Sequence, residues 1–229
     1  FGVEMSTTLD DLDFASPSRI GQALSGASSP TTTRLLTAGA LIGGAALFDR
    51  AANSYAYAPT TETKLTVVRK GGAALPYVAF GLAGTDWLLR RGSAEGDVAL
   101  QSVEAGLSTV AVSEAIKVAL DRSRPSEGRG AADFGHEKRS DSSFPSIHTA
   151  LAWSVLTPVA QHYDAPWLYG VAALTNVSRV SGHHHWLSDT VAASVLGYTI
   201  GDWFSSHGAI TLGSVMLVPH GVVVSAAFR

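Results

Sequence analysis

The chain is built mainly from Ala- and Leu-rich segments with helical patterning, separated by short stretches that hold Gly, Pro and Ser. Such segments, bounded by turn residues, predict helices. With 46% hydrophobic and 15% charged residues among 229, the chain can bury a sizeable core and is too apolar to be disordered. We therefore expect an all-α fold, a single bundle of about six core helices at residues 34–50, 65–91, 97–121, 147–162, 165–180 and 186–205.

The two ends of the chain differ from this helical part. Residues 6–33 are rich in Ser and Thr and are interrupted by prolines, which indicates an extended arm. Near the C-terminus, Pro219-His220-Gly221 lies between two short runs rich in β-branched residues, so a β-hairpin is expected at about 210–228. The expected organisation is an arm over 1–33, a helical domain over 34–206, and a β-like tail over 207–229 on or beside the core.

Membrane spans are not favoured by the pattern of apolar residues. Residues 35–48 are apolar, but the run is shorter than the ~20 residues that a span needs. Residues 98–120 are long enough but include Glu104, Glu114 and Lys117, and charges inside lipid are costly. We expect a soluble domain, with an integral membrane bundle as the alternative.

Charge and cysteine content exclude several classes of protein. A net charge of −3 without any block of like charge provides no basic surface for nucleic acid, so no nucleic-acid partner is expected. The absence of cysteine excludes disulfides and thiolate metal sites. Because the chain begins with Phe1 rather than Met, we expect a processed or trimmed product, and a removed secretion signal would be invisible.

The first stretch that contains candidate functional residues is "EAIKVALDRSRPSEG". Lys117 and Arg124 are seven residues apart, which is two helical turns, so we expect both cations on nearly the same face at the end of a helix. Pro125 discourages further helix. Taken alone, two such residues are ordinary surface cations whose stems cover apolar surface.

The second stretch is "SSFPSIHTALAW", at the start of a predicted helix. Ser146 could simply cap that helix, and His148 could be a first-turn residue without a role. The charged loop 126–143 joins this stretch to the first one. The loop is either a solvated connection or a lid that uses the flexibility of Gly128, Gly130 and Gly135.

The third stretch, "SRVSGHHHWLSD", contains three consecutive histidines. Their side chains diverge on a helix or strand, so a metal triad is rejected, and His183 and His184 are interpreted as loop residues. Asp189 lies four residues after His185, so its carboxylate can hold one ring nitrogen protonated and leave the other as a nucleophile. The guanidinium of Arg179 can donate paired hydrogen bonds to phosphate oxygens.

Together, the order and spacing of these three stretches resemble the type-2 phosphatidic acid phosphatase superfamily. That family includes bacterial non-specific acid phosphatases, lipid phosphate phosphatases and vanadium haloperoxidases. The resemblance is anchored between residues 117 and 189. One position departs from the family pattern, because Ile147 replaces the glycine of the usual Pro-Ser-Gly-His motif. A backbone N–H remains available there, although the added side chain can narrow the phosphate pocket.

The resemblance implies a metal-independent phosphatase that needs no cofactor and forms a phosphohistidine. His185 attacks phosphorus, Asp189 orients the imidazole, and His148 protonates the leaving alcohol and later activates water. The charged, in-line transition state requires positive donors around the equatorial phosphate oxygens. The residues that resemble the family's phosphate-binding set are Lys117, Arg124, Ser146, Ile147 and Arg179.

The expected substrates are phosphate monoesters, lipid phosphates or pyrophosphates. The resemblance implies a periplasmic or cell-envelope location with peripheral membrane contact, and it leaves the oligomeric state undetermined. Two alternatives stay open. One is a vanadate-dependent haloperoxidase, since vanadate bound by the same phosphate-binding residues mimics the transition state at phosphorus. The other is an envelope-binding module with a degenerate site, to which Ile147 would contribute. We expect His185 to be an exposed pocket histidine.

Overall fold

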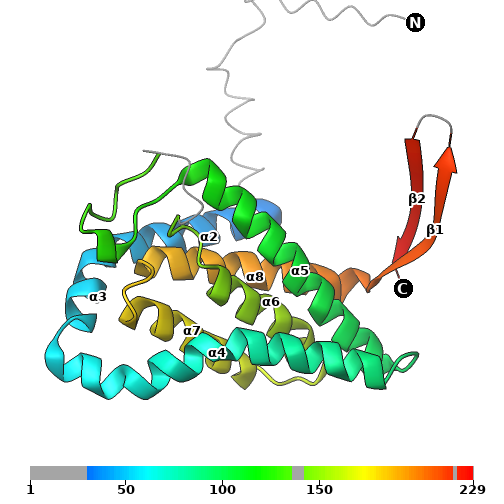
Figure 1. Cartoon of the computed structure of the whole chain (residues 1–229), viewed down its shortest axis with the longest axis horizontal. Helices are drawn as coiled ribbons and strands as arrows, with labels where there is room; N and C mark the ends of the chain where they lie inside the picture. Colours follow the sequence, from blue (N-terminus) through cyan, green and yellow to red (C-terminus); the bar gives the residue numbers. More distant parts are fainter. Residues whose placement is uncertain (1–29, 136–141, 219–220, 229) are drawn as a thin grey trace, which may run out of the picture. The chain divides into compact units, whose positions relative to one another are not determined.

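The computed structural model describes residues 30–135, 142–218 and 221–228, and this part of the chain is mainly helical (Figure 1). The all-α expectation is confirmed. The seven α-helices of the described residues are α2 (Pro30–Leu47), α3 (Asp49–Ala56), α4 (Pro59–Leu89), α5 (Ala94–Leu120), α6 (Ile147–His162), α7 (Trp167–Ser181) and α8 (Leu187–His207), with a 3-10 turn, η2 (Pro125–Glu127), between α5 and α6.

From α5 onward the helix boundaries lie within about three residues of the sequence expectation, whereas α4 begins at Pro59 rather than at residue 65. The helix expected over 34–50 is divided at Phe48 into α2 and α3, because Phe48 leaves the helical conformation with φ −100° and ψ 0°. Residues 30–33, expected in the arm, form the first turn of α2, and residues 1–29 lie outside the described part. The break at Phe48 lets the next residue, Asp49, turn its side chain inward.

Helix α6 packs against α4, α5, α7 and α8 (Figure 1). Close approach is possible because small residues occupy the contacts. A Cβ atom added at Gly197 of α8 would lie 2.3 Å from the carbonyl oxygen of Ala150, and one at Gly201 would lie 2.7 Å from Cβ of Thr157. Any side chain at these two glycines would push α8 away from α6. Fully buried alanines continue this small-residue core at Ala105, Ala150, Ala152, Ala172 and Ala193.

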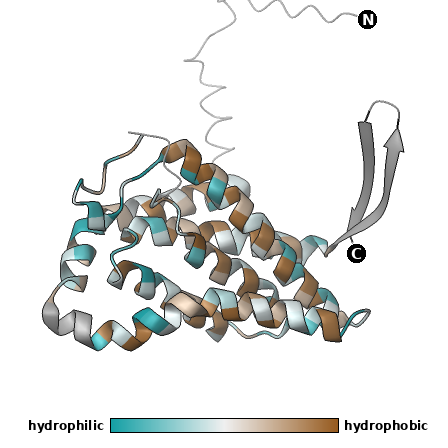
Figure 2. Cartoon of the chain, viewed as in Figure 1, coloured by the Kyte–Doolittle hydropathy of each residue, from teal (hydrophilic) through white to brown (hydrophobic). Residues whose placement is uncertain are grey.

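The end of α5 determines where the first cations lie. Ser93 caps the start of this helix by accepting a hydrogen bond from the Gly96 N–H at 3.1 Å. Asp121 ends the helix in a left-handed conformation, with φ 39°. Lys117 is therefore in the last turn of α5, whereas Arg124 lies beyond the helix, next to η2. The expectation that both share a helix face is wrong. Figure 2 shows hydrophilic residues gathered along this connection.

The C-terminal segment forms the expected β-hairpin. Strand β1 (Ile210–Val218) pairs antiparallel with β2 (Gly221–Phe228), with an irregularity in the register between Leu212 and Ser214. The connecting residues 219–220 lie outside the described part.

Within the described ranges, no single helix combines the length and apolar character needed to cross a membrane. The pair formed by Thr31–Leu47 and Asp49–Ala56, bent by 51°, meets that requirement by length and composition when both helices are taken together.

Candidate active site

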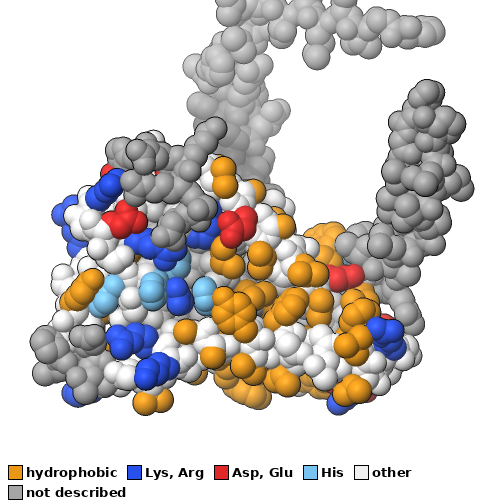
Figure 3. All heavy atoms as spheres, viewed as in Figure 1, with side chains coloured by type: hydrophobic (Ala, Val, Ile, Leu, Met, Phe, Trp, Pro, Cys, Tyr) orange, Lys and Arg blue, Asp and Glu red, His pale blue; other side chains and the backbone are white. Residues whose placement is uncertain are grey.

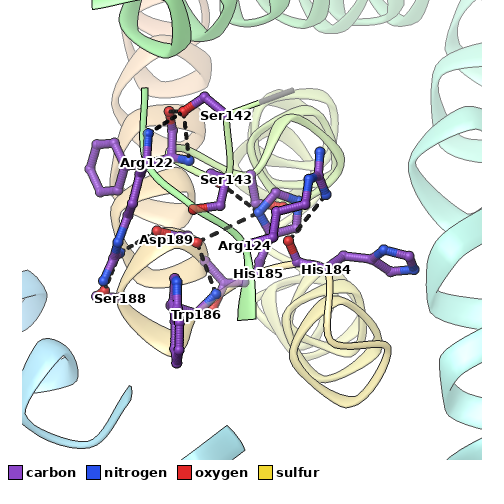
Figure 4. Close-up of polar contacts among 12 residues, drawn as sticks. Arg122, Arg124, Ser142, Ser143, His184, His185, Trp186, Ser188 and Asp189 are labelled. Carbon is purple, nitrogen blue, oxygen red and sulfur yellow. Dashed lines mark hydrogen bonds and ion pairs between the residues drawn. The ribbon is translucent and has the colours of Figure 1, made fainter. Parts of the chain in front are cut away.

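His185 lies just before α8, with its side chain only 3% exposed. The expectation of an exposed histidine is therefore wrong. Its Nδ1 lies 2.6 Å from the carbonyl oxygen of Ser143 and 3.7 Å from Oδ2 of Asp189 (Figure 4). A carbonyl can only accept, so Nδ1 carries the proton and, in the neutral ring, the lone pair is on Nε2. The geometry leaves His185 with one nitrogen suited to nucleophilic attack.

Asp189 has partners that the sequence did not reveal. Its carboxylate accepts a hydrogen bond from the Trp186 N–H at 2.8 Å, which caps the start of α8, and another from the guanidinium of Arg122. Burial raises the pKa of Asp189 to about 6, against the lowering effects of Arg122 and the Trp186 N–H. We infer an ionised carboxylate at neutral pH, and the Ser143 carbonyl is the closer partner of His185.

Arg122 joins two buried carboxylates behind this histidine. One nitrogen, Nη1, donates to Asp189 and to the Ser188 hydroxyl at 2.8 Å, and Nη2 donates to Oδ2 of Asp49 at 2.8 Å. Nε and Nη2 also donate to the Ala131 carbonyl at 2.9 and 2.6 Å. Asp49 in turn accepts from the Ser188 N–H and hydroxyl, at 2.8 and 2.7 Å. This network ties α3 to the start of α8.

Two loop segments form the wall that holds the Ser143 carbonyl (Figure 4). Ser143 donates its N–H to the Arg122 carbonyl at 2.7 Å and its hydroxyl to the Ser123 carbonyl at 3.1 Å. The Trp186 indole also donates to the Ser123 carbonyl, at 2.8 Å. The orientation of His185 thus depends on contacts between residues far apart in the sequence, and no local signal marks Ser143.

The three predicted cations surround His185. The pKa of His185 lies well below its ordinary value, because burial and then the positive charges of Arg179, Lys117 and Arg124 disfavour protonation, while the Ser143 carbonyl opposes this. The structure therefore brings together residues from the end of α5, the following loop and the end of α7. A neutral imidazole among three cations is suited to an anionic ligand.

Each cation is held differently. The Lys117 ammonium is buried and donates to the Ser142 carbonyl, and an Arg124 Nη1 donates to the His184 carbonyl at 3.1 Å. Arg179 is half-buried, and its Nε is buried without a hydrogen-bond partner within the described part of the chain. Because a buried N–H is rarely left unpaired, Arg179 Nε indicates a ligand position beside His185.

The start of α6 adds backbone donors to the same place. Ser146 is buried and precedes the helix, and its N–H donates to the Asp189 carbonyl at 3.4 Å. Its hydroxyl accepts from Thr149 at 3.1 Å and makes no capping hydrogen bond to α6. Ile147 and His148 are the first two residues of the helix, where backbone N–H groups and the helix dipole favour an anion.

His148, in the first turn of α6, lies near His185 and Arg179. Burial, followed by the charges of Arg179 and His185, lowers its pKa to about 4, so the imidazole is neutral at pH 7. Its Nε2 lies 2.9 Å from the Tyr77 hydroxyl, and the two rings meet edge to face at 5.2 Å. Tyr77 belongs to α4, 71 residues earlier, and was not predicted to be a site residue.

The remaining histidines of the triple run are placed elsewhere. His183 stacks on Tyr57 with ring centroids 3.2 Å apart and contacts Asn53 at 3.2 Å. The His184 side chain is exposed and points away from Asp189 in Figure 4. Over residues 30–135, 142–218 and 221–228, no three His, Cys, Asp or Glu residues are grouped so that they could hold a metal ion.

The charged loop between the first two stretches is described only in part. Gly128, Gly130 and Gly135 adopt positive φ angles of 71°, 103° and 76°, which favour glycine. Residues 136–141 of the expected lid lie outside the described part.

Residues 99–208 match the family model of the PAP2 superfamily. The chain carries a PAP2 superfamily domain. The resemblance drawn from the three sequence stretches is thereby confirmed. Those stretches all lie within the matched range, from Lys117 in the first to Asp189 in the third.

The chain is also similar to two lipid phosphatases. A segment is 35% identical over 72 residues to lipid A 1-phosphatase from Porphyromonas gingivalis, covering 28% of this chain and 16% of that protein. The match thus spans about a sixth of that relative's length. The fold resembles the crystal structure of a transmembrane PAP2-type phosphatidylglycerolphosphate phosphatase from Bacillus subtilis, with a TM-score of 0.52 and 19% identity. That similarity covers 76% of this chain and 91% of the solved one.

Proposed function

We propose that the chain is a metal-independent phosphatase that hydrolyses phosphate esters of lipids, including lipid pyrophosphates, through a phosphohistidine. The observation that carries this proposal is the buried Nε of Arg179, which has no hydrogen-bond partner among the described residues and lies beside an imidazole whose Nδ1 donates to the Ser143 carbonyl. A phosphoryl group between them would meet a nucleophile and a cation at once. The similarity to lipid A 1-phosphatase supports a lipid phosphate as substrate.

In the first step, Nε2 of His185 attacks phosphorus while the bond from phosphorus to the leaving oxygen breaks. His148 supplies the proton that the leaving alcohol takes up. Arg179, Arg124 and Lys117 stabilise the negative charge on the three equatorial oxygens. Ser146 and the backbone N–H groups at the start of α6 add further hydrogen-bond donors. These donors are oriented before the substrate arrives.

In the second step, His148 removes a proton from water, and the water oxygen attacks phosphorus. The bond from phosphorus to Nε2 of His185 then breaks, which releases inorganic phosphate and returns the imidazole to its neutral form. The low pKa of His185 favours this neutral form between turnovers, and His148 holds the proton from water for the next leaving group. Asp189 contributes as a positioning residue that keeps the start of α8 in place.

We place this activity at the cell envelope. The two similar proteins are a lipid A 1-phosphatase and a transmembrane phosphatidylglycerolphosphate phosphatase, which supports a membrane-associated substrate. Membrane contact would be peripheral in this chain.

The proposal is tested by phosphate release from phosphatidic acid in detergent and from nitrophenyl phosphate in buffer. His185→Ala should abolish both reactions, and His184→Ala, which alters an exposed neighbour, should retain most of the activity. Loss of activity in His184→Ala with retention in His185→Ala would reverse the assignment.

Two additions to the same assay address cofactors. A chelator should leave the rate unchanged, and vanadate should inhibit by occupying the cradle as a transition-state mimic. Inactivation by the chelator with recovery in a divalent cation would refute the metal-independent mechanism. If the chain hydrolysed no ester but oxidised bromide with peroxide once loaded with vanadate, the haloperoxidase alternative would replace the phosphatase. Vanadate binding without either reaction would leave a binding module.

A further inference from the structure

Tyr77 marks the side of His148 on which a leaving group would lie. Its hydroxyl is 2.9 Å from His148 Nε2, and its side chain is 58% exposed, so it stands between the imidazole and solvent. If His148 protonates the leaving oxygen, that oxygen replaces the Tyr77 hydroxyl at this nitrogen. The organic part of the substrate would then continue along α4.

An apolar groove of about 730 Å³ runs along α4 from Gly71 to Leu89 and passes the neighbours of Tyr77. Ala74 and Val78, which neighbour Tyr77 on α4, both line it. The groove follows α4 away from the site and is completed by α5, α6 and α7. Further residues on its walls are Leu75, Ala79, Leu82, Val155, Val159 and Val171. Figure 3 shows histidine and basic side chains at one side of this face, with hydrophobic side chains over the part next to them.

We propose that this groove binds the hydrocarbon chain of the leaving group, with the phosphate at Arg179 and the chain lying along α4. This inference rests on the proposed phosphatase function and adds a separate binding site to it. The class of ligand is a monophosphate ester with a long alkyl or acyl chain.

The dimensions of the groove fit such a chain. From Val78 to Leu89, α4 rises by about 17 Å, at about 1.5 Å per residue. A lipid chain spans one leaflet, which is half of a hydrocarbon core about 30 Å thick. The volume also lies within the range of small-molecule pockets, which are mostly apolar.

The distribution of charge determines the direction of the ligand. Polar groups on the groove walls, among them Asp86 and Glu95, lie at the end away from the histidines, and both are acidic. The opposite end reaches Gly71, on the turn of α4 whose Arg69 carbonyl accepts a hydrogen bond from the Ser178 hydroxyl at 2.6 Å, and Ser178 directly precedes the cationic Arg179. An anionic head group is therefore disfavoured at one end and favoured at the other, as expected for an amphiphilic phosphate.

The experiment compares kcat/KM for n-alkyl phosphates from methyl to decyl, all kept below the concentration at which they form micelles. In the unchanged protein, each added methylene should raise kcat/KM by about twofold to fourfold until the groove is filled. In Leu82→Asp, the ratio of decyl to methyl phosphate should fall by about tenfold, because a carboxylate replaces an apolar wall.

Leu107→Asp on α5 is the matched control. Leu107 is 59% exposed and Leu82 is 65% exposed, but Leu107 does not line the groove. The control should keep the chain-length dependence of the unchanged protein. Ala83→Phe provides a second groove variant that fills space without adding charge, and it should also lower the decyl-to-methyl ratio. Circular dichroism verifies folding of each variant.

Three outcomes would overturn the inference. One is an absence of chain-length dependence in the unchanged protein, and another is equal dependence in the Leu82→Asp and Leu107→Asp proteins. The third is a dimer that Leu82→Asp converts to a monomer while the chain-length dependence survives, since the groove would then be an interface between copies. Failure of the underlying phosphatase function looks different, because no alkyl phosphate would be hydrolysed faster than by His185→Ala.

Discussion

Replacing Asp49 by Asn should destabilise the fold strongly, although Asp49 lies outside the matched PAP2 range. The Asp49 and Arg122 side chains are 1% and 4% exposed, and they pair at 2.8 Å. In the variant, the amide NH2 group would take the place of Oδ2, which accepts hydrogen bonds from Arg122 and from the Ser188 hydroxyl. Oδ1 would still accept from the Ser188 N–H. The change therefore removes the charge and leaves most of the shape.

The magnitude follows from burial. Removing one partner of a buried ion pair lowers the free energy of unfolding by about 3–5 kcal/mol. For a chain of this size, that loss lowers Tm by about 6–20 °C, at about 2–4 °C per kcal/mol. The matched control is Asp86→Asn, because Asp86 pairs with Arg90 at a similar distance, 2.9 Å, while the two side chains are 36% and 53% exposed. An exposed pair of this kind contributes about 0.3–0.5 kcal/mol.

Urea unfolding followed by circular dichroism measures both variants at one pH and salt concentration. The Asp49→Asn midpoint should shift far more than the Asp86→Asn midpoint, with unchanged slopes. Equal, small shifts in the two variants would refute the reasoning, since the buried network would then contribute no more than a surface pair. Arg122→Lys should also destabilise, because an ammonium cannot reproduce the forked hydrogen bonds of a guanidinium.

Three further predictions concern pH and phosphate binding. His148 must carry a proton to protonate an alcohol, and its pKa is lowered to about 4, so kcat/KM for alkyl phosphates should rise as pH falls from about 7 toward 5. Nitrophenyl phosphate, whose leaving group needs no proton, should lack that rise, and identical profiles for the two esters would contradict the role. The pKa of His185 is lower in the folded than in the unfolded chain, where it is about 6.5. The unfolded state therefore binds more protons, so the free energy of unfolding should be highest above pH 6.5 and should fall as pH falls below that value. His185→Asn should then show a shallower loss of urea stability on acidification, and an unchanged slope would argue against it. Arg179→Ala should weaken vanadate inhibition by about tenfold to a hundredfold, and an unaltered inhibition constant would remove Arg179 from the cradle.

Local features of the fold were predictable from the sequence. Helix α6 has the predicted bounds, 147–162, because an apolar run follows Pro145 and ends before a turn. The hairpin at the C-terminus was predicted for the same kind of reason, since β-branched runs flank a Pro-containing turn. The break at Phe48 was not predictable, because it depends on the contacts of Asp49 with residues that follow it by more than seventy positions.

The sequence by itself was enough to recognise the family and to predict a set of candidate reactive groups, because both depend on residue types at short, regular spacings. It also predicted His185, rather than its two neighbours, as the nucleophile, through the four-residue spacing to Asp189. The tertiary structure alone decided that the Ser143 carbonyl holds the imidazole, that Arg122 pairs with Asp49, and that Tyr77 meets His148. These contacts join distant segments, and their geometry follows from how the helices pack rather than from any local period.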